Sequence, residues 1–295
     1  MKETNNIVWL ASYPKSGNTW FRVFLSNLFQ NNSRPAHINE LKETGIASAR
    51  TIFDEITGLP SEDLTHEEID HLRPEVYQWI SEEAEEVIFK KVHDAYTYLP
   101  DGRPLFPPEA SRSVIYFIRE PLDVAVSFAH HSAKKPEEMI KALNNPEFSF
   151  CGRRNRFYNQ LRQKLGTWSQ HVKSWVDQGN IPVHVMRYED MKKDSFQTFK
   201  SAVHFLGLDK SDEEIKNAIE LSDLSVLQEQ EKEKGFREKS IKAEFFFRKG
   251  STGEGRQLFS TDKINQIIDN HMDVLQRFGY LRYLMLDVRY LMLDV

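Results

Sequence analysis

Residues 12–20 read SYPKSGNTW and lie between an apolar run, Ile7–Ala11, and a segment with helical periodicity. The run predicts a buried strand, and an apolar stripe at i, i+3, i+4 spacing over 21–29 predicts a helix. A turn from strand into helix presents free backbone N–H groups, and the helix dipole adds positive potential there. Lys15 adds a full charge. The stretch therefore predicts an anion-binding turn, with further side-chain donors from Ser16, Asn18 and Thr19.

This turn differs from the nucleotide P-loop, whose spacing is G-x-x-x-x-G-K-[ST]. Here Lys15 precedes Gly17, and the first glycine of that pattern is missing. We interpret the turn as a phosphate cradle of another kind. The alternative is a plain helix N-cap with an exposed lysine, and it leaves Lys15 and Gly17 unexplained.

Four short runs rich in β-branched or aromatic residues alternate with helical patterns along the chain. The runs are Ile7–Ala11, Val87–Val92, Val114–Ile118 and Val183–Arg187, and helical stripes cover 168–176 and 264–275. Pro121 is suited to the first position of a helix after the third run. The alternation predicts an α/β fold, a three-layer doubly wound sandwich around a mainly parallel sheet, like that of P-loop nucleotide-binding proteins.

The remaining segments are less regular. Residues 33–65 mix proline, glycine and polar residues, and 100–108 (PDGRPLFPP) predicts a loop. The charged stretch 228–255 ends in three glycines and predicts a mobile surface excursion. We expect a single domain over residues 1–281. Residues 282–288 and 289–295 repeat RYLMLDV, and we expect this tail to be an artefactual duplication without a role in the fold.

Composition limits the partners and the compartment. The chain has 295 residues, 40% of them hydrophobic, and a net charge of −5, so no global field recruits nucleic acid or an anionic membrane. No apolar stretch approaches the roughly 18–20 residues of a membrane span, and no secretory signal is visible. The single cysteine, Cys151, suits a reducing compartment and predicts an ordinary small side chain. We expect a soluble cytoplasmic protein.

Polar side chains follow each predicted strand. Ligands of open parallel sheets bind beyond the carboxyl ends of the strands. At these ends come Lys15, His93 with Lys91 two residues before it, Arg119 and Tyr188. We therefore expect these side chains to gather along one edge of the sheet and form a site.

The sequence resembles the cytosolic-type sulfotransferases, and we expect a bacterial member. These enzymes use 3′-phosphoadenosine 5′-phosphosulfate (PAPS) and release adenosine 3′,5′-bisphosphate (PAP). Five blocks carry the resemblance in the family's order: SYPKSGNTW (12–20) is similar to its 5′-phosphosulfate loop, FKKVHD (89–94) to its catalytic-histidine strand, VIYFIREPLDVAVS (114–127) to its 3′-phosphate motif, MRYEDM (186–191) to its adenine-side tyrosine segment, and FFRKGSTGEGRQLF (246–259) to its closing Arg-Lys-Gly loop.

The resemblance implies a role for each matching position. His93 would be the general base, since a histidine accepts a proton near neutrality, and Lys15 and Lys91 would stabilise the charge that develops in transfer. The cofactor would be held by Lys15, Ser16, Gly17, Asn18, Thr19, Trp20, Arg119, Ser127, Tyr188, Ser222, Arg248, Lys249 and Gly250. On the residues alone, Lys91 could equally be a solvated surface lysine, and Trp20 could be a core residue. The resemblance implies no metal.

Two other functions remain open from the sequence: a P-loop-type nucleotide kinase, and a nucleotide-binding protein without catalysis. The acceptor is also open. The Phe245–Phe247 triplet and the tyrosines Tyr96 and Tyr98 make an aromatic, lipid, glycan or natural-product small molecule reasonable. His130 and His131 point about 100° apart in a helix, so we expect them to line the acceptor entrance or face solvent rather than share a metal. The oligomeric state is open.

Overall fold

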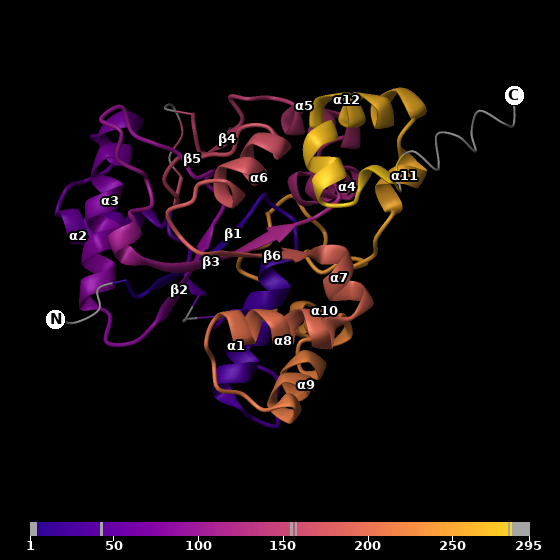
Figure 1. The fold of residues 1–295 in the computed structure, drawn as a ribbon, viewed down its shortest axis with the longest axis horizontal. Helices are drawn as coiled ribbons and strands as arrows, with labels where there is room; N and C mark the ends of the chain where they lie inside the picture. Colours follow the sequence, from indigo (N-terminus) through magenta and orange to yellow (C-terminus); the bar gives the residue numbers. More distant parts are fainter. Residues whose placement is uncertain (1–4, 42–43, 154–155, 157, 283, 285–295) are drawn as a thin grey trace, which may run out of the picture.

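The computed structural model describes residues 5–41, 44–153, 156, 158–282 and 284 (Figure 1). The four predicted strands are present as β1 (Ile7–Ser12), β2 (Ile88–Val92), β3 (Ser111–Ile118) and β6 (Val183–Arg187). They form one sheet in the order β2-β1-β3-β6, and every neighbouring pair is parallel. All four carboxyl ends therefore lie at the same edge.

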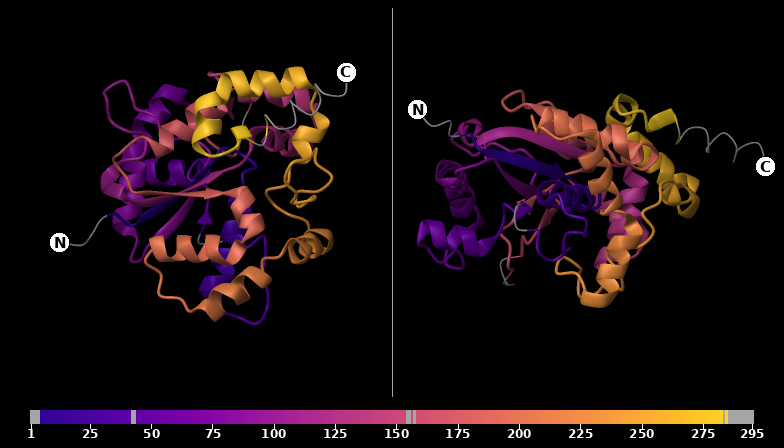
Figure 2. Two further views of the ribbon diagram at one scale, coloured as in Figure 1. Left: turned by 45° about the vertical axis from the view of Figure 1, so that its right-hand side comes forward. Right: turned by 90° about the horizontal axis from the view of Figure 1, so that it is seen from below.

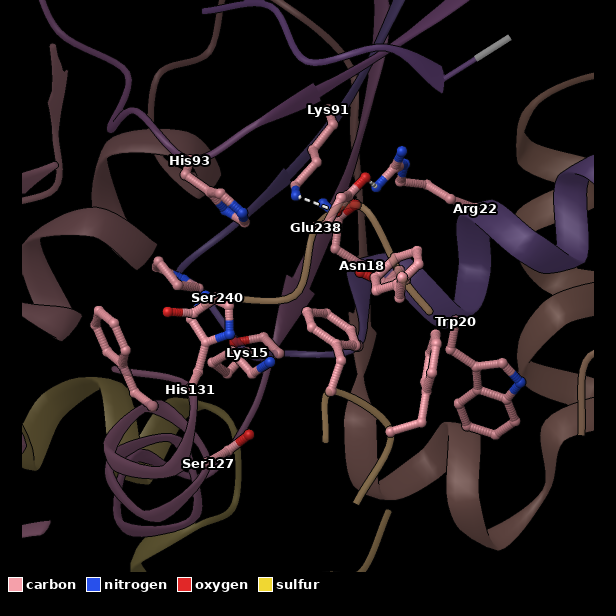
Figure 3. Close-up of a pocket in the computed structure, with 18 of the residues that line it drawn as sticks. Lys15, Asn18, Trp20, Arg22, Lys91, His93, Ser127, His131, Glu238 and Ser240 are labelled. Carbon is pink, nitrogen blue, oxygen red and sulfur yellow. Dashed lines mark hydrogen bonds and ion pairs between the residues drawn. The ribbon is translucent and has the colours of Figure 1, made fainter. Parts of the chain in front are cut away.

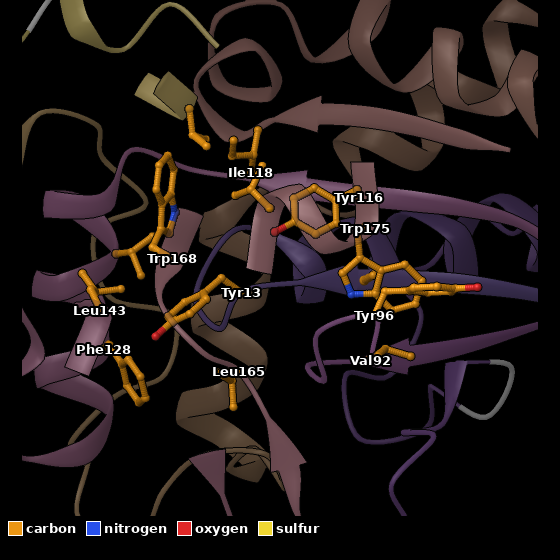
Figure 4. Close-up of a cluster of buried hydrophobic side chains, with 14 of the residues drawn as sticks. Tyr13, Val92, Tyr96, Tyr116, Ile118, Phe128, Leu143, Leu165, Trp168 and Trp175 are labelled. Carbon is orange, nitrogen blue, oxygen red and sulfur yellow. The ribbon is translucent and has the colours of Figure 1, made fainter. Parts of the chain in front are cut away.

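Helices cover both faces of this sheet, as Figures 1 and 2 show. One face packs against α1 (Asn18–Gln30), α8 (Ser195–Phe205) and α9 (Asp212–Glu220), and the other against α4 (Pro121–Ser132), α5 (Pro136–Leu143), α6 (Trp168–Val176) and α12 (Thr261–Arg277). In β1, Val8 and Leu10 face the first layer while Trp9 and Ala11 face the second, because side chains alternate along a strand. Figure 4 shows part of the apolar cluster between the sheet and this second layer, including Tyr116 and Trp175. The predicted three-layer α/β fold is confirmed.

The helix starts have local causes. Pro121 occupies the first turn of α4, and the Glu120 side chain accepts hydrogen bonds from the backbone N–H groups of Leu122 and Asp123. Thr167 and Gln170 form a capping box at the start of α6. Such caps satisfy backbone donors that have no partner inside the helix. The remaining elements are α2 (Arg50–Thr57), α3 (His66–Glu83), the 3-10 helix η2 (Pro108–Ala110), β4 (Ser149–Phe150), β5 (Gln163–Lys164), α7 (Tyr188–Lys193), α10 (Leu224–Lys234) and α11 (Glu254–Leu258).

The irregular region 33–65 contains more structure than its composition indicates. Besides α2, it supplies a short extended stretch along the outer side of β2. There the Lys91 N–H donates to the Gly45 carbonyl at 2.9 Å, and the Ala47 N–H donates to the Lys91 carbonyl at 2.9 Å. This stretch pairs backbone groups of an edge strand that would otherwise be exposed.

The charged stretch 228–255 is more than the surface excursion that its composition predicts, although Ile241 and Phe245 within it are exposed. Its first residues extend α10, and α11 begins at its end. Between them, Phe236 and Phe247 are buried in a cluster with Val23, Ile38 and Leu227, among others. The aromatic residues give the stretch an apolar side that its high charge conceals in the sequence.

The repeated tail lies almost entirely outside the described residues, with Arg282 and Leu284 as its described members. Leu284 is fully buried in the apolar cluster between the sheet and the layer of α4, α5, α6 and α12. The expectation that the tail has no role in the fold is therefore wrong for this residue. Within the described residues, no helix combines the length and the apolar character that a membrane crossing requires.

A buried ion pair fixes the turn that follows β2. Arg73 of α3 binds both carboxylate oxygens of Asp94, each at 2.9 Å, and both side chains are at most 2% exposed. The Trp175 indole N–H donates to the Asp94 carbonyl at 2.8 Å. Asp94 directly follows His93, so these contacts fix the backbone beside a predicted site residue.

We expect Arg73→Leu to lower the free energy of unfolding by about 3–5 kcal/mol, because it leaves the buried Asp94 carboxylate without its partner. Urea unfolding followed by circular dichroism measures this loss. Arg103→Ala is the control: its pairs with Glu75 and Asp101 are exposed, so its effect should stay within about 1 kcal/mol. Equal losses in the two variants would contradict the assignment.

Candidate functional site

A cavity of about 960 Å³ opens at the carboxyl edge of the sheet. It brings together the side chains predicted to gather there: Lys15 after β1, Lys91 and His93 at the end of β2, Arg119 after β3 and Tyr188 after β6. Figure 3 shows Lys91 and His93 in the upper part of the view, Trp20 at the lower right and Lys15 at the lower left beside His131. The structure therefore places these residues around one space.

The turn between β1 and α1 has the geometry of an anion cradle. Lys15 has a φ of 73° and Gly17 a φ of 103°, which turn the chain sharply into the helix. The Asn18 side-chain amide donates to the Leu10 carbonyl at 2.7 Å and ties the helix start to the strand. The Ser16 hydroxyl and the Asn18 Oδ1 are buried without a hydrogen-bond partner among the described residues. A buried hydroxyl with no partner fits a site that an anion completes.

Gly17 is also required for close packing. A Cβ at this position would lie 2.9 Å from Cδ2 of the Tyr188 ring. The glycine therefore lets the tyrosine that follows β6 approach the turn, which leaves both on the cavity wall.

Lys15 lies inside the cavity and is crowded by other cations. Burial, followed by the charges of Lys91 and Arg119, lowers its pKa to about 7. Its ammonium lies 3.8 Å from the centre of the Phe246 ring, a cation–π contact that offsets part of the lost hydration. A bound anion would stabilise the charged form further.

His93 presents one nitrogen to the cavity. Its Nδ1 donates to the Ser12 backbone carbonyl at 2.9 Å. Because a carbonyl can only accept, this bond fixes the proton on Nδ1 and leaves the Nε2 lone pair available. Burial and the neighbouring Lys91 charge hold the His93 pKa well below its usual value. His93 is therefore neutral near pH 7, the form that a general base needs.

A second histidine holds the backbone of the first. His171 Nε2 donates to the His93 carbonyl at 3.0 Å, while the Tyr116 hydroxyl lies 2.8 Å from His171 Nδ1. Burial lowers the pKa of His171 to about 4, so it stays neutral. The sequence shows no signal for this supporting pair, since Tyr116 and His171 are far apart along the chain.

Glu238 is a site residue that the sequence does not indicate. Its carboxylate binds the Lys91 ammonium at 2.8 Å and the Arg22 guanidinium at 2.7 Å (Figure 3). Burial alone would raise the pKa of Glu238, but Lys91 and Arg22 outweigh it and hold this pKa well below the usual range. Burial likewise lowers the pKa of Lys91, and Glu238 opposes that shift. The carboxylate thus favours the charged form of Lys91.

Arg119 joins two loops of the site. Its Nη1 donates to the Lys15 carbonyl at 3.1 Å and its Nη2 to the Ser251 carbonyl at 2.9 Å. The guanidinium carbon lies 4.2 Å from the centre of the Tyr188 ring. Its Nε is buried without a hydrogen-bond partner among the described residues. Ser127, which lies in the following helix α4, also lines the cavity.

The Arg248–Gly250 loop lies on the same wall and is held in place from two sides. Arg248 binds the Glu254 carboxylate through both terminal nitrogens, at 2.9 and 2.5 Å, and Lys249 binds it at 3.1 Å. The Asp123 carboxylate of α4 accepts hydrogen bonds from the Gly253 and Gly255 N–H groups, each at 2.8 Å. These contacts position the loop beside Arg119.

Two predicted nucleotide contacts have different outcomes. Trp20 lines the cavity and also packs edge-on against Phe199, with ring centres 5.2 Å apart. Ser222 does not line the cavity: it is fully buried, accepts from the Asn27 amide at 2.9 Å and donates to the Ala218 carbonyl at 2.6 Å. Its neighbours Asp223 and Leu224 line the cavity instead.

The cysteine and the other histidines near the cavity show no sign of forming a nucleophile or a metal site. Burial raises the pKa of the Cys151 thiol to about 11, so it stays protonated. His131 lines the cavity, and burial followed by the charges of Lys15 and Lys91 lowers its pKa to about 4, whereas His130 is exposed. Across the described part of the chain, no three His, Cys, Asp or Glu side chains are grouped to hold a metal ion.

Comparison with known proteins agrees with this geometry. The sulfotransferase domain family matches residues 5–279. Human sulfotransferase 1E1 is 26% identical over 93% of this chain and 85% of its own length. Flavonol 3-sulfotransferase of Flaveria bidentis is 25% identical over 90% of this chain and 82% of its own.

Two solved structures share the fold. Retinol dehydratase, solved with androsterone and PAP, superposes with a TM-score of 0.60 at 20% identity, over 93% of this chain and 81% of its own. Mouse sulfotransferase SULT7A1, solved with PAP, gives 0.58 at 19% identity, over 97% and 89%. The chain belongs to the sulfotransferase domain family and is a PAPS-dependent sulfotransferase.

Proposed function

We propose that His93 is the general base of a direct transfer from PAPS to the hydroxyl, or less often the amine, of a small-molecule acceptor. The observation that carries this proposal is the fixed His93 tautomer, whose Nε2 lone pair faces the same cavity as Lys15 and Lys91. Nε2 takes the acceptor proton as the acceptor oxygen attacks sulfur in line. The bond from sulfur to the bridging oxygen breaks, and PAP leaves with that electron pair.

Lys15 and Lys91 are proposed to stabilise the charge that shifts during this step. Lys15 would hold the bridging oxygen, where negative charge grows as the bond to sulfur breaks, and Lys91 would hold a sulfuryl oxygen. Fixed cations in a buried site stabilise such charge strongly. Two amines thus supply the charge neutralisation within the cavity.

The rest of the cofactor is proposed to lie along the other wall. Arg119, Ser127, Arg248, Lys249 and the Gly250 N–H would bind the 3′-phosphate, since guanidinium forks match phosphate oxygens. Trp20 and Tyr188 would contact the adenine, and the Ser16–Thr19 turn the 5′-phosphosulfate. The unpartnered Ser16 Oγ and Arg119 Nε support this placement.

The acceptor is proposed to be a small molecule with an apolar body. Phe128 and Phe150, with ring centres 5.5 Å apart, form an apolar wall beside His93, and two matched relatives are named for flavonols. An aromatic compound, lipid, glycan or natural product would fit such a wall. A cytoplasmic location and membership of the family's bacterial branch stay predictions, the first supported by the single cysteine.

We expect His93→Ala to lower turnover at least ~100-fold, the usual scale for the loss of a general base, while PAP still binds. Sulfate transfer from radiolabelled PAPS and calorimetry of PAP binding measure the two effects. His130→Ala, which changes an exposed histidine on α4, is the control and should keep normal turnover. Near-normal turnover in His93→Ala would contradict the base assignment.

We expect PAP binding to take up a proton above pH 7. The Lys15 pKa is about 7 in the free protein, and bound phosphates favour the charged amine and raise this pKa. At pH values between the Lys15 pKa of the free protein and that of the PAP complex, the affinity for PAP should fall by up to about tenfold per pH unit as pH rises. Below pH 7 Lys15 is charged in both states, so its contribution to the pH dependence should vanish.

Calorimetry at pH 8 in buffers of different ionisation enthalpy measures the proton uptake. Lys15→Met should abolish it because the titrating amine is gone. The absence of proton uptake in the wild-type protein at pH 8 would show that Lys15 does not contact the phosphates.

We expect Glu238→Gln to favour PAPS over PAP. The Glu238 carboxylate binds the Lys91 ammonium in the structure. It would therefore repel the sulfuryl group of PAPS at Lys91, whereas PAP carries no sulfuryl group. Like charges placed together oppose binding, so their removal should raise the ratio of the PAP to the PAPS dissociation constant several-fold. Glu244→Gln changes an exposed carboxylate of the same segment and should leave the ratio unchanged. An unchanged ratio in Glu238→Gln would place the sulfuryl group away from Lys91.

A further inference from the structure

We propose that the natural acceptor is an anion: a hydroxyl compound with a flat apolar body and a carboxylate or phosphate at the end remote from the hydroxyl. This inference rests on the proposed function and adds the charge class of the acceptor. Its basis is that several cations of the cavity wall are not among the proposed cofactor contacts, Lys134, Arg156 and Lys242 among them.

The cavity wall is strongly cationic although the chain as a whole carries a net charge of −5. Among the described residues that line it, the carboxylates are Asp223 and Glu238, and Glu238 is already bound by Lys91 and Arg22. Eleven lysines and arginines line the same wall among the described residues, against these two carboxylates. The positive field is therefore a local property of this cavity.

The proposed cofactor contacts use a separate group of these cations. Lys15 and Lys91 are assigned to the sulfuryl end, and Arg119, Arg248 and Lys249 to the 3′-phosphate. Lys134, Arg156 and Lys242 have no part in that assignment. None of these three forms an ion pair within the described part of the chain, and Arg156 lies 5.3 Å from the Tyr158 ring centre.

Each of the three cations lies on a segment whose neighbouring residues line the same cavity as His93. Arg156 lies six residues after Phe150, whose ring stands edge-on to His93 with centres 6.3 Å apart. Lys134 lies just beyond the end of α4, three residues after His131, and Lys242 lies two residues after Ser240. Figure 3 shows His131 and Ser240 on the same side of the view as His93, with Lys15 and Ser127 also on that side. Exposed cations on these three segments would meet the outer end of a bound acceptor.

The aromatic wall explains how such an acceptor would be oriented. The rings of Phe128 and Phe150 flank the approach to His93 and suit a flat apolar body. A hydroxyl that reaches His93 Nε2 leaves the opposite end of this body at the rim. An anionic group there would form charge-assisted hydrogen bonds with the cations, and the positive field would steer its approach.

The test compares phenols that differ in the charge of one end: 3-(4-hydroxyphenyl)propionate, 2-(4-hydroxyphenyl)ethyl phosphate, the neutral propionamide and the cationic tyramine. At least one of the two anions should exceed the amide in kcat/KM by about tenfold, and tyramine should be poorest. Added salt should reduce the advantage, because the rim is exposed. The preferred anion identifies the group. An amide as good as both anions would overturn the inference.

Variants connect this preference to the cations. The triple variant Lys134→Gln, Arg156→Gln and Lys242→Gln should reduce the anion's kcat/KM to the level of the amide, with the amide and PAP binding unchanged. Lys232→Gln, an exposed lysine of α10 outside the cavity, is the control and should keep the full preference. A triple variant that retains the preference would overturn the assignment to these residues.

Binding to the enzyme–PAP complex separates the two proposals. Calorimetry of each phenol with this complex measures charge preference without turnover. Tighter binding of an anion without sulfate transfer would contradict the proposed chemistry and support the anionic acceptor. Equal binding of anion and amide, together with normal transfer, would leave the proposed chemistry intact and overturn the inference made here.

Discussion

Several basic side chains converge at the carboxyl edge of β1, and their mutual repulsion has to be balanced inside the fold. Lys15, Lys91, Arg22 and Arg119 share this space. Glu238 binds two of them, the Phe246 ring faces the third, and backbone carbonyls accept from the fourth. Much of this compensation comes from residues 235–253. The stretch that completes the cavity therefore also makes the cationic cavity stable.

The same field sets the protonation states of the reacting groups. Burial and nearby positive charge lower the pKa of both Lys15 and His93. For His93 this favours the neutral base, while for Lys15 it leaves an amine whose charge depends on the anion beside it. A polyanionic ligand reduces the repulsion among the cations of the cavity. This favours the binding of such ligands over neutral ones.

Much of this arrangement can be predicted from the sequence, because it depends on local patterns. The four strands follow from short apolar runs, and Lys15, His93, Arg119 and Tyr188 follow from their positions after those strands. Glu238 could not be predicted, since its partners lie far away in the sequence and several other charged residues surround it there. Ser222 is the reverse case, a residue that the sequence assigns to the site and that does not line the cavity in the structure. A motif match places it at the nucleotide, but burial and two hydrogen bonds direct its hydroxyl into the core.

Residues 235–253 are anchored independently at two ends. Phe236 at the start of this stretch, and Phe247 farther along, are buried against α1 and α10. At the other end, Asp123 holds the backbone at Gly253 and Gly255, and a Cβ on Gly255 would come within 2.4 Å of the Leu122 backbone. Between Glu238 and Phe246, the exposed Ile241 and Phe245 carry no such constraint. The side chains at these two positions can therefore be exchanged without disturbing the contacts that hold Glu238 and Phe246 at the cavity.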